Sequence, residues 1–215
     1  MCFDLRQRLF YAILDADYVS ASAWTAKCRS LIEGGADLIQ VRAKQASLER
    51  CDELIKAVRP LTKAAGIPLI INDHLSIALR YPDVGLHVGQ EDTPPKVCRK
   101  YLGPQRLLGL STHSIKQARA AIALGNTLNY FAVGPVFATP TKPSYIPVGL
   151  ECVRCVAALN PPLPFYAIGG LSRRTVKRVV SAGVRRAVVV SDVLRATDTA
   201  KAVRQIRTDL CAERR

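Results

Sequence analysis

Short apolar segments alternate with longer amphipathic segments along almost the whole chain. The apolar segments are rich in β-branched and aromatic residues, as is typical of strands buried on both faces of a parallel sheet. Strands are expected at residues 9–14, 38–44, 68–73, 84–89, 107–112, 130–133, 164–170 and 186–191. A helical pattern follows each strand, at residues 21–32, 47–65, 75–80, 95–101, 115–124, 150–159, 172–182 and 197–211. Glycine ends several of these helices, as it commonly does.

Eight consecutive strand–helix units predict an α/β fold, a single-domain (β/α)8 TIM barrel over residues 1–215. A doubly wound open sheet is the alternative. That fold would leave eight units hard to place, and no G-x-G-x-x-G motif follows the first strand. Neither a linker nor a break in composition divides the chain, so we expect one domain.

A long loop at residues 134–149 follows the sixth strand and contains four prolines, which restrict its backbone. It carries Thr139, Thr141 and Lys142. Two hydroxyls and an ammonium group on a stiffened loop suit an anionic ligand, most simply a phosphate. The alternative is an ordinary solvated loop.

The active site of a TIM barrel lies at the carboxyl ends of the strands, so polar residues should gather there. Gln40, Arg42 and Lys44 alternate at the end of the second strand, and a period of two places them on one face. Two cations and an amide in the barrel mouth would be costly unless they met an anion. The alternative is a polar face that points outward.

Two acidic residues follow adjacent strands. Asn72 and Asp73 end the third strand, whereas Asp92 lies just beyond the fourth, which contains His87. Two carboxylates near phosphate-binding cations suit Mg²⁺, which combines few carboxylates with phosphate oxygens and water. The alternative is that both aspartates cap helices.

The remaining strand ends are also polar or glycine-rich. Ser111, Thr112 and His113 end the fifth strand, and His113 could be an acid or base, a substrate partner or a helix cap. The ends of the seventh and eighth strands supply a second phosphate site, because glycines let backbone N–H groups approach phosphate oxygens. Its residues are Gly169, Gly170, Val190 and Ser191.

Composition places the chain among soluble globular proteins, with 49% hydrophobic and 22% charged residues. No apolar run could span a bilayer and the N-terminus lacks the shape of a signal peptide, so we expect a cytoplasmic protein with no membrane partner. Seven scattered cysteines are expected to be reduced thiols. Cys152 and Cys155 form a C-x-x-C without a second pair, which disfavours a zinc or redox site.

The net charge of +14 is the strongest argument for a nucleic-acid partner. The basic residues are nevertheless dispersed, and aromatic residues make up only 6% of the chain. No nucleic-acid partner is therefore expected, and the charge is assigned to attraction of phosphorylated small molecules.

Seven motifs occur in the order found in thiamine-phosphate synthases, and the chain resembles that family over nearly its whole length. The motifs are Gln40-Val-Arg-Ala-Lys44, Ile71-Asn-Asp73, His87-Val-Gly-Gln-Glu-Asp92, Ser111-Thr-His113, the segment 134–142, Ile168-Gly-Gly170 and Val189-Val-Ser191. One motif alone would be weak evidence for the resemblance, but seven motifs in the same order at strand ends are specific to the family.

The resemblance implies that the chain joins hydroxymethylpyrimidine diphosphate to hydroxyethylthiazole phosphate, carboxylated or plain, and releases diphosphate. It implies Mg²⁺ on Asp73 and Asp92, and a catalytic role for the cations that bind the leaving diphosphate. The implied diphosphate ligands are Arg42, Lys44, Asn72 and Lys142; the implied pyrimidine ligands are Gln40 and Ser111; and the implied thiazole phosphate ligands are Thr139, Thr141, Gly170 and Ser191. Val190 is a further expected substrate-binding residue.

The related thiazole tautomerase is the principal alternative, since it uses a histidine at the position of His113. The pair Asp73 and Asp92 favours the synthase, because the tautomerase does not need a metal-bound diphosphate. One departure is His74, where many synthases have an arginine. The sequence is also compatible with a homo-oligomer.

Overall fold

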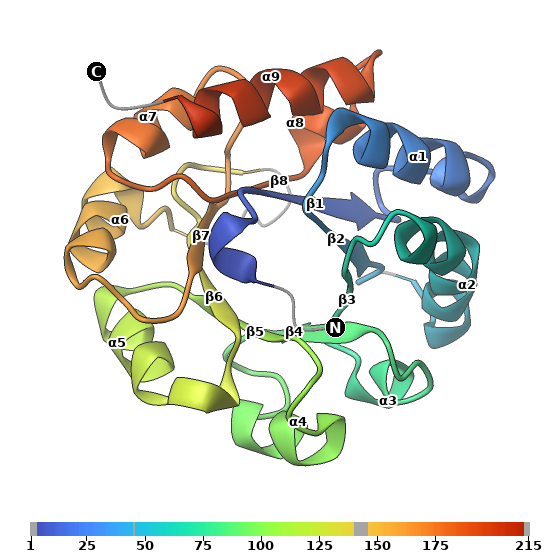
Figure 1. The fold of residues 1–215 in the computed structure, drawn as a ribbon, viewed down its shortest axis with the longest axis horizontal. Helices are drawn as coiled ribbons and strands as arrows, with labels where there is room; N and C mark the ends of the chain where they lie inside the picture. The colour runs from blue at the N-terminus through green and yellow to red at the C-terminus, as the bar shows by residue number, and fades with distance from the viewer. Residues whose placement is uncertain (1–3, 45, 140–145, 213–215) are drawn as a thin grey trace.

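Eight parallel strands close into a barrel in the order β1 to β8, with β8 returning to pair with β1 (Figure 1). The computed structural model describes residues 4–44, 46–139 and 146–212. The strands are β1 Phe10–Asp15, β2 Leu38–Arg42, β3 Leu69–Asn72, β4 Gly85–Val88, β5 Leu108–Thr112, β6 Tyr130–Val133, β7 Phe165–Ile168 and β8 Ala187–Val189. The predicted (β/α)8 barrel is therefore confirmed.

Helices surround the barrel and cover its outer face (Figure 1). They are α1 Trp24–Gly34, α2 Leu48–Ala64, α3 Leu75–Ala78, α4 Pro95–Leu102, α5 Ile115–Ala123, α6 Gly149–Ala158, α7 Val176–Ser181, α8 Ser191–Leu194 and α9 Thr199–Cys211. Short 3₁₀ helices lie at Leu5–Gln7, Ala21–Ala23 and Gly125–Thr127. Within the described ranges, no helix is long and apolar enough to cross a membrane.

Two predicted boundaries are wrong around the last strands. The helix expected from Ser172 begins only at Val176, because a turn precedes it in which the hydroxyl of Thr175 accepts a hydrogen bond from the Ser172 N–H. The strand expected to reach Ser191 ends at Val189, and Ser191 instead begins the short helix α8. The sequence therefore missed an additional helix at the barrel mouth.

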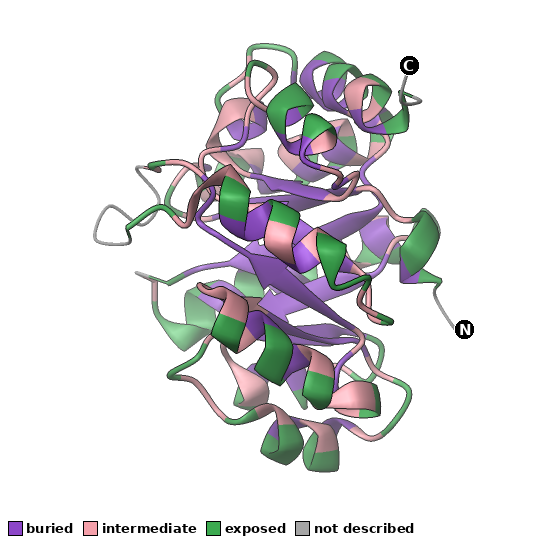
Figure 2. Cartoon of the chain, turned by 90° about the vertical axis from the view of Figure 1, so that its left-hand side faces the viewer, coloured by how far each residue is buried: buried purple, intermediate pink, exposed green. Residues whose placement is uncertain are grey.

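The core has two layers that the strands separate. One layer fills the space between the strands and the helices. Figure 2 shows the buried strands in purple, enclosed by helices with exposed residues in green. The other layer fills the barrel and includes Tyr11, Tyr130 and Tyr166. Leu5, in the 3₁₀ helix before β1, joins this inner layer, and Figure 1 shows that helix across the centre of the ring. The amino-terminal end of the barrel is therefore covered, which leaves the carboxyl end for a site.

Close contact between α1 and α9 depends on Gly34. A Cβ atom at this position would lie 2.6 Å from Cβ of Val203 and 2.9 Å from the carbonyl oxygen of Ala200. Both distances are shorter than packed atoms tolerate, so only glycine allows the two helices this spacing.

We predict that Gly34→Ala lowers the free energy of unfolding, although alanine favours a helix by up to about 1 kcal/mol over glycine. Overpacking costs about 1–3 kcal/mol and should outweigh that gain. Urea unfolding measures the difference. Arg29→Ala, on the exposed face of α1, is the control and should change stability by less than about 0.5 kcal/mol. Equal stability of Gly34→Ala and the native chain would contradict the packing argument.

Candidate active site at the barrel mouth

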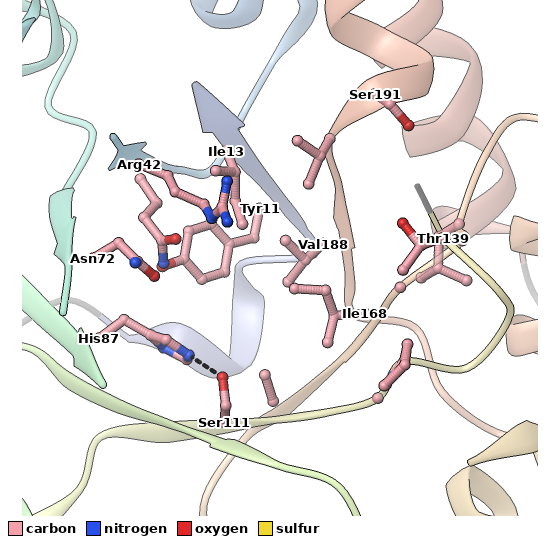
Figure 3. Close-up of a pocket in the computed structure, with 18 of the residues that line it drawn as sticks. Tyr11, Ile13, Arg42, Asn72, His87, Ser111, Thr139, Ile168, Val188 and Ser191 are labelled. Atoms are coloured by element: carbon pink, nitrogen blue, oxygen red, sulfur yellow. Dashed lines mark hydrogen bonds between the residues drawn. The ribbon is translucent and has the colours of Figure 1, made fainter. Parts of the chain in front are cut away.

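Two adjoining cavities open at the carboxyl ends of the strands and contain most of the predicted site residues (Figure 3). Among those predicted, the first is lined by Gln40, Arg42, Asn72, Ser111, Thr139, Gly170, Val190 and Ser191. The second is lined by Arg42, Lys44, Asn72, Asp73, Asp92 and Ser111. The two cavities therefore share Arg42, Asn72 and Ser111, and His113 also lines both. The predicted residues Thr141 and Lys142 lie outside the described residues.

A buried carboxylate fixes the position of Arg42 at the end of β2. The Nη1 atom of Arg42 lies 2.5 Å from Oδ2 of Asp15 and 3.4 Å from Oδ2 of Asp17. The side chain of Asp15 is completely buried, whereas that of Asp17 is 34% exposed. Burial raises the pKa of the Asp15 carboxyl, and the charge of Arg42 opposes that effect. Arg42 is thus held in the mouth before any anion arrives.

Asp15 and Asp17 were not predicted as part of the site. Their sequence signal was a pair of acidic residues at the carboxyl end of the first strand, the same place where the other polar residues gather. An acidic pair does not itself suggest an anion site. Its role becomes apparent only when the pairing of β1 with β2 sets Asp15 opposite Arg42.

Lys44 lies beyond β2, which ends at Arg42 and is shorter than expected. Its side chain is 52% exposed, and its Nζ atom lies 3.8 Å from Oδ2 of Asp73. Asp73 itself has a φ of 64°, in the left-handed region that non-glycine residues rarely adopt. The turn after β3 therefore directs the Asp73 carboxylate toward the second cavity, where Lys44 partly balances its charge.

Neither predicted metal-binding aspartate is a helix cap. The N-cap residues of α3 and α4 are His74 and Pro94, and neither makes a side-chain capping hydrogen bond. Asp92 instead closes the turn after β4, where its Oδ2 accepts a hydrogen bond of 2.7 Å from the N–H of Gly89. The capping alternative is therefore wrong for both Asp73 and Asp92.

The donor set in the second cavity fits Mg²⁺. Asp73 and Asp92 supply carboxylate oxygens, the ligands that Mg²⁺ prefers, and both line the same cavity. The described residues hold no cluster of three or more His, Cys, Asp or Glu side chains that could enclose a metal ion. This open arrangement suits an ion that takes its other ligands from a substrate and from water.

The loop after β7 forms the opposite side of the mouth. Gly169 and Gly170 have φ values of 93° and 64°, and the chain after β6 crosses directly over them. The N–H of Phe137 donates a 3.0 Å hydrogen bond to the Gly169 carbonyl. A Cβ at Gly170 would lie 2.6 Å from Cβ of Phe137. Glycine thus permits the approach that brings Thr139 to the first cavity.

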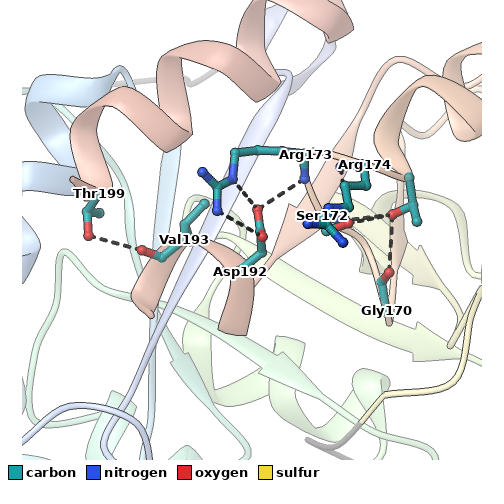
Figure 4. Close-up of polar contacts among 8 residues, drawn as sticks. Gly170, Ser172, Arg173, Arg174, Asp192, Val193 and Thr199 are labelled. Carbon is teal, nitrogen blue, oxygen red and sulfur yellow. Dashed lines mark hydrogen bonds and ion pairs between the residues drawn. The ribbon is translucent and has the colours of Figure 1, made fainter. Parts of the chain in front are cut away.

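An ion pair joins this loop to α8 (Figure 4). Oδ2 of Asp192 accepts hydrogen bonds of 3.0 Å from both the backbone N–H and Nε of Arg173. Asp192 follows Ser191, and Arg173 lies three residues beyond Gly170. The pair therefore braces the two segments that carry the predicted phosphate ligands.

His113 is bound to the loop that follows β6. Its Nδ1 atom lies 2.5 Å from the carbonyl oxygen of Gly134, so Nδ1 carries the hydrogen and donates it. The capping role considered for His113 is wrong, because the hydroxyl of Ser114 caps α5 by accepting a hydrogen bond from the Gln117 N–H. His113 lines both cavities, so contact with a ligand is compatible with its position.

Two tyrosine hydroxyls that the sequence did not single out lie at the first cavity, that of Tyr11 in its lining and that of Tyr130 buried beneath it. The hydroxyls of Tyr11 and Tyr130 lie 2.8 Å apart, and Nε2 of Gln40 donates to the Tyr11 hydroxyl over 2.7 Å. His87 contacts both Tyr130 and Ser111. The two tyrosines lie within apolar strands and resemble core residues in the sequence. Only closure of the barrel brings their hydroxyls together.

A family model described as thiamine monophosphate synthase matches residues 10–193 of this chain. The thiamine-phosphate synthase of Chloroflexus aurantiacus is 38% identical over 198 residues, which cover 92% of this chain and 90% of that protein. The corresponding protein of Moorella thermoacetica is 41% identical over 180 residues, covering 83% of this chain and 84% of its own.

The fold comparison gives the same result. The thiamine phosphate pyrophosphorylase structure from Pyrococcus furiosus superposes with a TM-score of 0.84 and 29% sequence identity. The match covers 96% of this chain and 98% of that one. The similarity thus extends over the whole barrel and is not confined to the motifs at the strand ends.

We predict that Asp15→Ala lowers the free energy of unfolding by about 3–5 kcal/mol, because the mutation leaves the Arg42 guanidinium buried without its main partner. Asp17→Ala is the matched control and should cost less than about 1 kcal/mol, since its carboxylate is partly exposed and screened. Urea denaturation of the two variants measures the difference. Similar losses in both would show that Asp15 is not the principal partner of Arg42.

Proposed function

This chain belongs to the thiamine monophosphate synthase family, and we infer from that premise that it is a thiamine-phosphate synthase. It is a transferase that joins hydroxymethylpyrimidine diphosphate to hydroxyethylthiazole phosphate and releases diphosphate. The observation that carries this function is the pair of anion sites on one barrel mouth. One site gathers around Arg42 and Lys44, and the other around Gly170 and Ser191.

The spacing of the two sites supports a two-substrate reaction. In Figure 3, Arg42 and Asn72 lie on one side of the first cavity, whereas Thr139 and Ser191 lie on the other. Ile168 and Val188 lie between them. The rings of a pyrimidine and a thiazole would occupy this apolar middle, while their phosphate groups would reach the polar sides.

We propose that the reaction depends on stabilising the leaving diphosphate. The bond between the pyrimidine methylene carbon and the diphosphate oxygen breaks, and its electron pair leaves with the diphosphate. The aminopyrimidine ring delocalises the resulting cation, and the thiazole nitrogen donates its lone pair to form the new C–N bond. No side-chain nucleophile is needed, so catalysis rests on charge stabilisation.

Each proposed diphosphate ligand has a distinct part in this step. Arg42, held by Asp15, offers a positioned guanidinium group. Lys44 and Asn72 border the same cavity, and Lys142 would add a third cation from the loop after β6. Fixed cations act on the charge that develops on the diphosphate without reorganising during the reaction.

We further propose that Asp73 and Asp92 hold Mg²⁺ in the second cavity. The ion would supply Lewis-acid neutralisation of the diphosphate charge. The proximity of Lys44 to Asp73 supports this arrangement, because a metal-bound diphosphate would lie between carboxylates and cations. The hydrogen bond from Gly89 fixes the carboxylate of Asp92 in the same cavity.

On the opposite side, we propose that the thiazole phosphate is bound by Thr139, Thr141, Gly170, Val190 and Ser191. The positive φ of Gly170 and the brace between Arg173 and Asp192 support this placement, because they hold the loop and α8 at a fixed separation.

We also propose a cytoplasmic location, which the free thiols of the described cysteines fit.

The direct test supplies both substrates with Mg²⁺ or with a chelator and measures thiamine phosphate. We expect product that depends on the metal. Product that is equally abundant with chelator would refute the metal proposal and leave the transferase assignment intact. Absence of product from folded protein in either condition would refute the function and favour the tautomerase, which is assayed separately on the thiazole.

We predict that Asp92→Ala lowers kcat by roughly 10²-fold or more, the cost of removing a group that stabilises developing charge. Its fold should be retained, because among the described residues the carboxylate is hydrogen-bonded within its own turn, to the N–H of Gly89. Asp198→Asn is the control, since it removes the same charge at the cap of α9, and Asp198 lines neither of the two cavities. A steady-state assay that gave Asp92→Ala the turnover of the control would exclude Asp92 from the metal site.

We also predict that kcat/KM for both phosphorylated substrates falls as salt increases. The net charge of +14 attracts anions over long distances, and salt screens that attraction. Raising the ionic strength from about 10 mM to about 100 mM shortens the Debye length from about 30 Å to about 10 Å. We expect roughly a 10-fold decrease. A rate independent of salt would mean that the basic surface does not steer the substrates.

A further inference from the structure

A chain of hydrogen bonds joins five strands at the first cavity: Gln40, Tyr11, His87 and Ser111 line the cavity, and Tyr130 lies buried beneath it. It runs from Nε2 of Gln40 to the Tyr11 hydroxyl over 2.7 Å, and from there to the Tyr130 hydroxyl over 2.8 Å. Tyr130 then contacts Nδ1 of His87 at 3.2 Å, and Nε2 of His87 contacts the Ser111 hydroxyl at 2.9 Å. The two ends of this chain, Gln40 and Ser111, are the residues assigned above to the pyrimidine.

We propose that Tyr11, Tyr130 and His87 form a relay that positions Gln40 and Ser111 and determines which end accepts and which end donates a hydrogen bond. The relay thereby makes the site specific for an aminopyrimidine over an oxopyrimidine. This inference rests on the proposed function, which it extends from the charged groups of the substrate to its ring.

Packing holds the members of the relay in place. Tyr130 meets Tyr11 edge to face with ring centroids 5.7 Å apart, and it stacks on His87 at 5.5 Å with an angle of 29°. Gly109 on β5 leaves the space for both rings, because a Cβ there would overlap Tyr130 and His87. The side chains are therefore confined to one arrangement, and their hydroxyls cannot turn to other partners without disturbing the core.

Burial keeps the two tyrosines of the relay neutral. Tyr11, Tyr130 and His87 are at most 5% exposed. Burial raises the pKa of both phenols far above the ordinary value, so each keeps its single hydroxyl hydrogen. A chain of hydrogen bonds with one hydrogen per link has a direction, because each hydroxyl that accepts from one neighbour donates to the next.

The orientation of Gln40 sets that direction. Its amide nitrogen can only donate, so Tyr11 accepts and passes its own hydrogen to Tyr130. Tyr130 then donates to Nδ1 of His87, which leaves the hydrogen of the histidine on Nε2 and directed at Ser111. In the part of the chain that the structure describes, Gln40 is left with its carbonyl oxygen for a ligand and Ser111 with its hydroxyl hydrogen.

This pair of groups matches an aminopyrimidine. An exocyclic amino group donates to the Gln40 carbonyl, and an unprotonated ring nitrogen accepts from Ser111. An oxopyrimidine reverses both groups, since its carbonyl accepts and its adjacent ring N–H donates. It would therefore leave the Gln40 carbonyl and the Ser111 hydroxyl unpaired beneath the bound ring, the kind of mismatch that sites reject most strongly.

The test compares Tyr130→Phe with the native chain on the natural pyrimidine diphosphate and on its 4-oxo analogue. We expect Tyr130→Phe to raise KM for the natural substrate about 10-fold with a smaller change in kcat, and to reduce the amino-over-oxo preference by about 10-fold or more. Tyr11→Phe breaks the relay at its other tyrosine and should have the same effect.

Tyr166→Phe is the matched control. Tyr166 is fully buried and lies edge to face with Tyr11 at 5.5 Å, but its hydroxyl donates to the carbonyl oxygen of Arg8 at the opposite end of the barrel. The variant loses a buried hydrogen bond outside the relay, so its thermal stability should fall while its substrate preference stays native. Loss of preference in Tyr166→Phe as well would mean that the relay variants act through general disruption of the core.

The outcomes separate the relay from the function itself. Thiamine phosphate formation by the native chain with equal use of both pyrimidines would overturn the relay and leave the function standing. A native amino-over-oxo preference in folded Tyr130→Phe and Tyr11→Phe would also overturn the relay and leave the function standing. Failure of the native chain to form product from either pyrimidine would instead overturn the function on which the relay rests.

Discussion

Closure of eight parallel strands into one barrel is the constraint on which the rest of the structure depends. A closed sheet has no free edge, and it turns alternate residues of every strand into a space that water does not fill. Polar side chains that face this space must therefore find partners there. The hydroxyls of Tyr11 and Tyr130 pair with each other, and Asp15 pairs with Arg42. The site is built from groups that barrel closure brings together.

The charges at the mouth are arranged so that anions can bind to a chain that is already folded. Arg42 is anchored by a buried carboxylate, and Lys44 lies against Asp73 without a tight ion pair. The carboxylates keep the cations from repelling one another in the absence of substrate. A bound diphosphate would share the cations with them, so binding needs little rearrangement of the protein.

The same barrel provides polar recognition and an apolar environment within one cavity. The edges of the cavity that would face the phosphates are made of turns and loops. Glycines and Asp73, which has a left-handed backbone conformation, allow the chain to curve tightly there. The floor of the cavity is made of strand residues that the core immobilises. Groups at the edges of the mouth would thus contact the phosphates, whereas immobilised side chains at the floor would contact the ring. This division fits a synthase whose substrates differ in their rings but share phosphate groups.

The barrel can be predicted from the sequence alone, because each strand and helix carries its own local pattern of apolar residues. The sequence also located Asp73, Asp92, Arg42 and Gly170, because strand ends can be recognised from the same pattern. Only the tertiary structure decided which side chains meet. The pairing of Asp15 with Arg42, the brace between Arg173 and Asp192 and the tyrosine relay all join residues from different strands or loops. Local patterns carry no record of such contacts, since register and barrel closure set them.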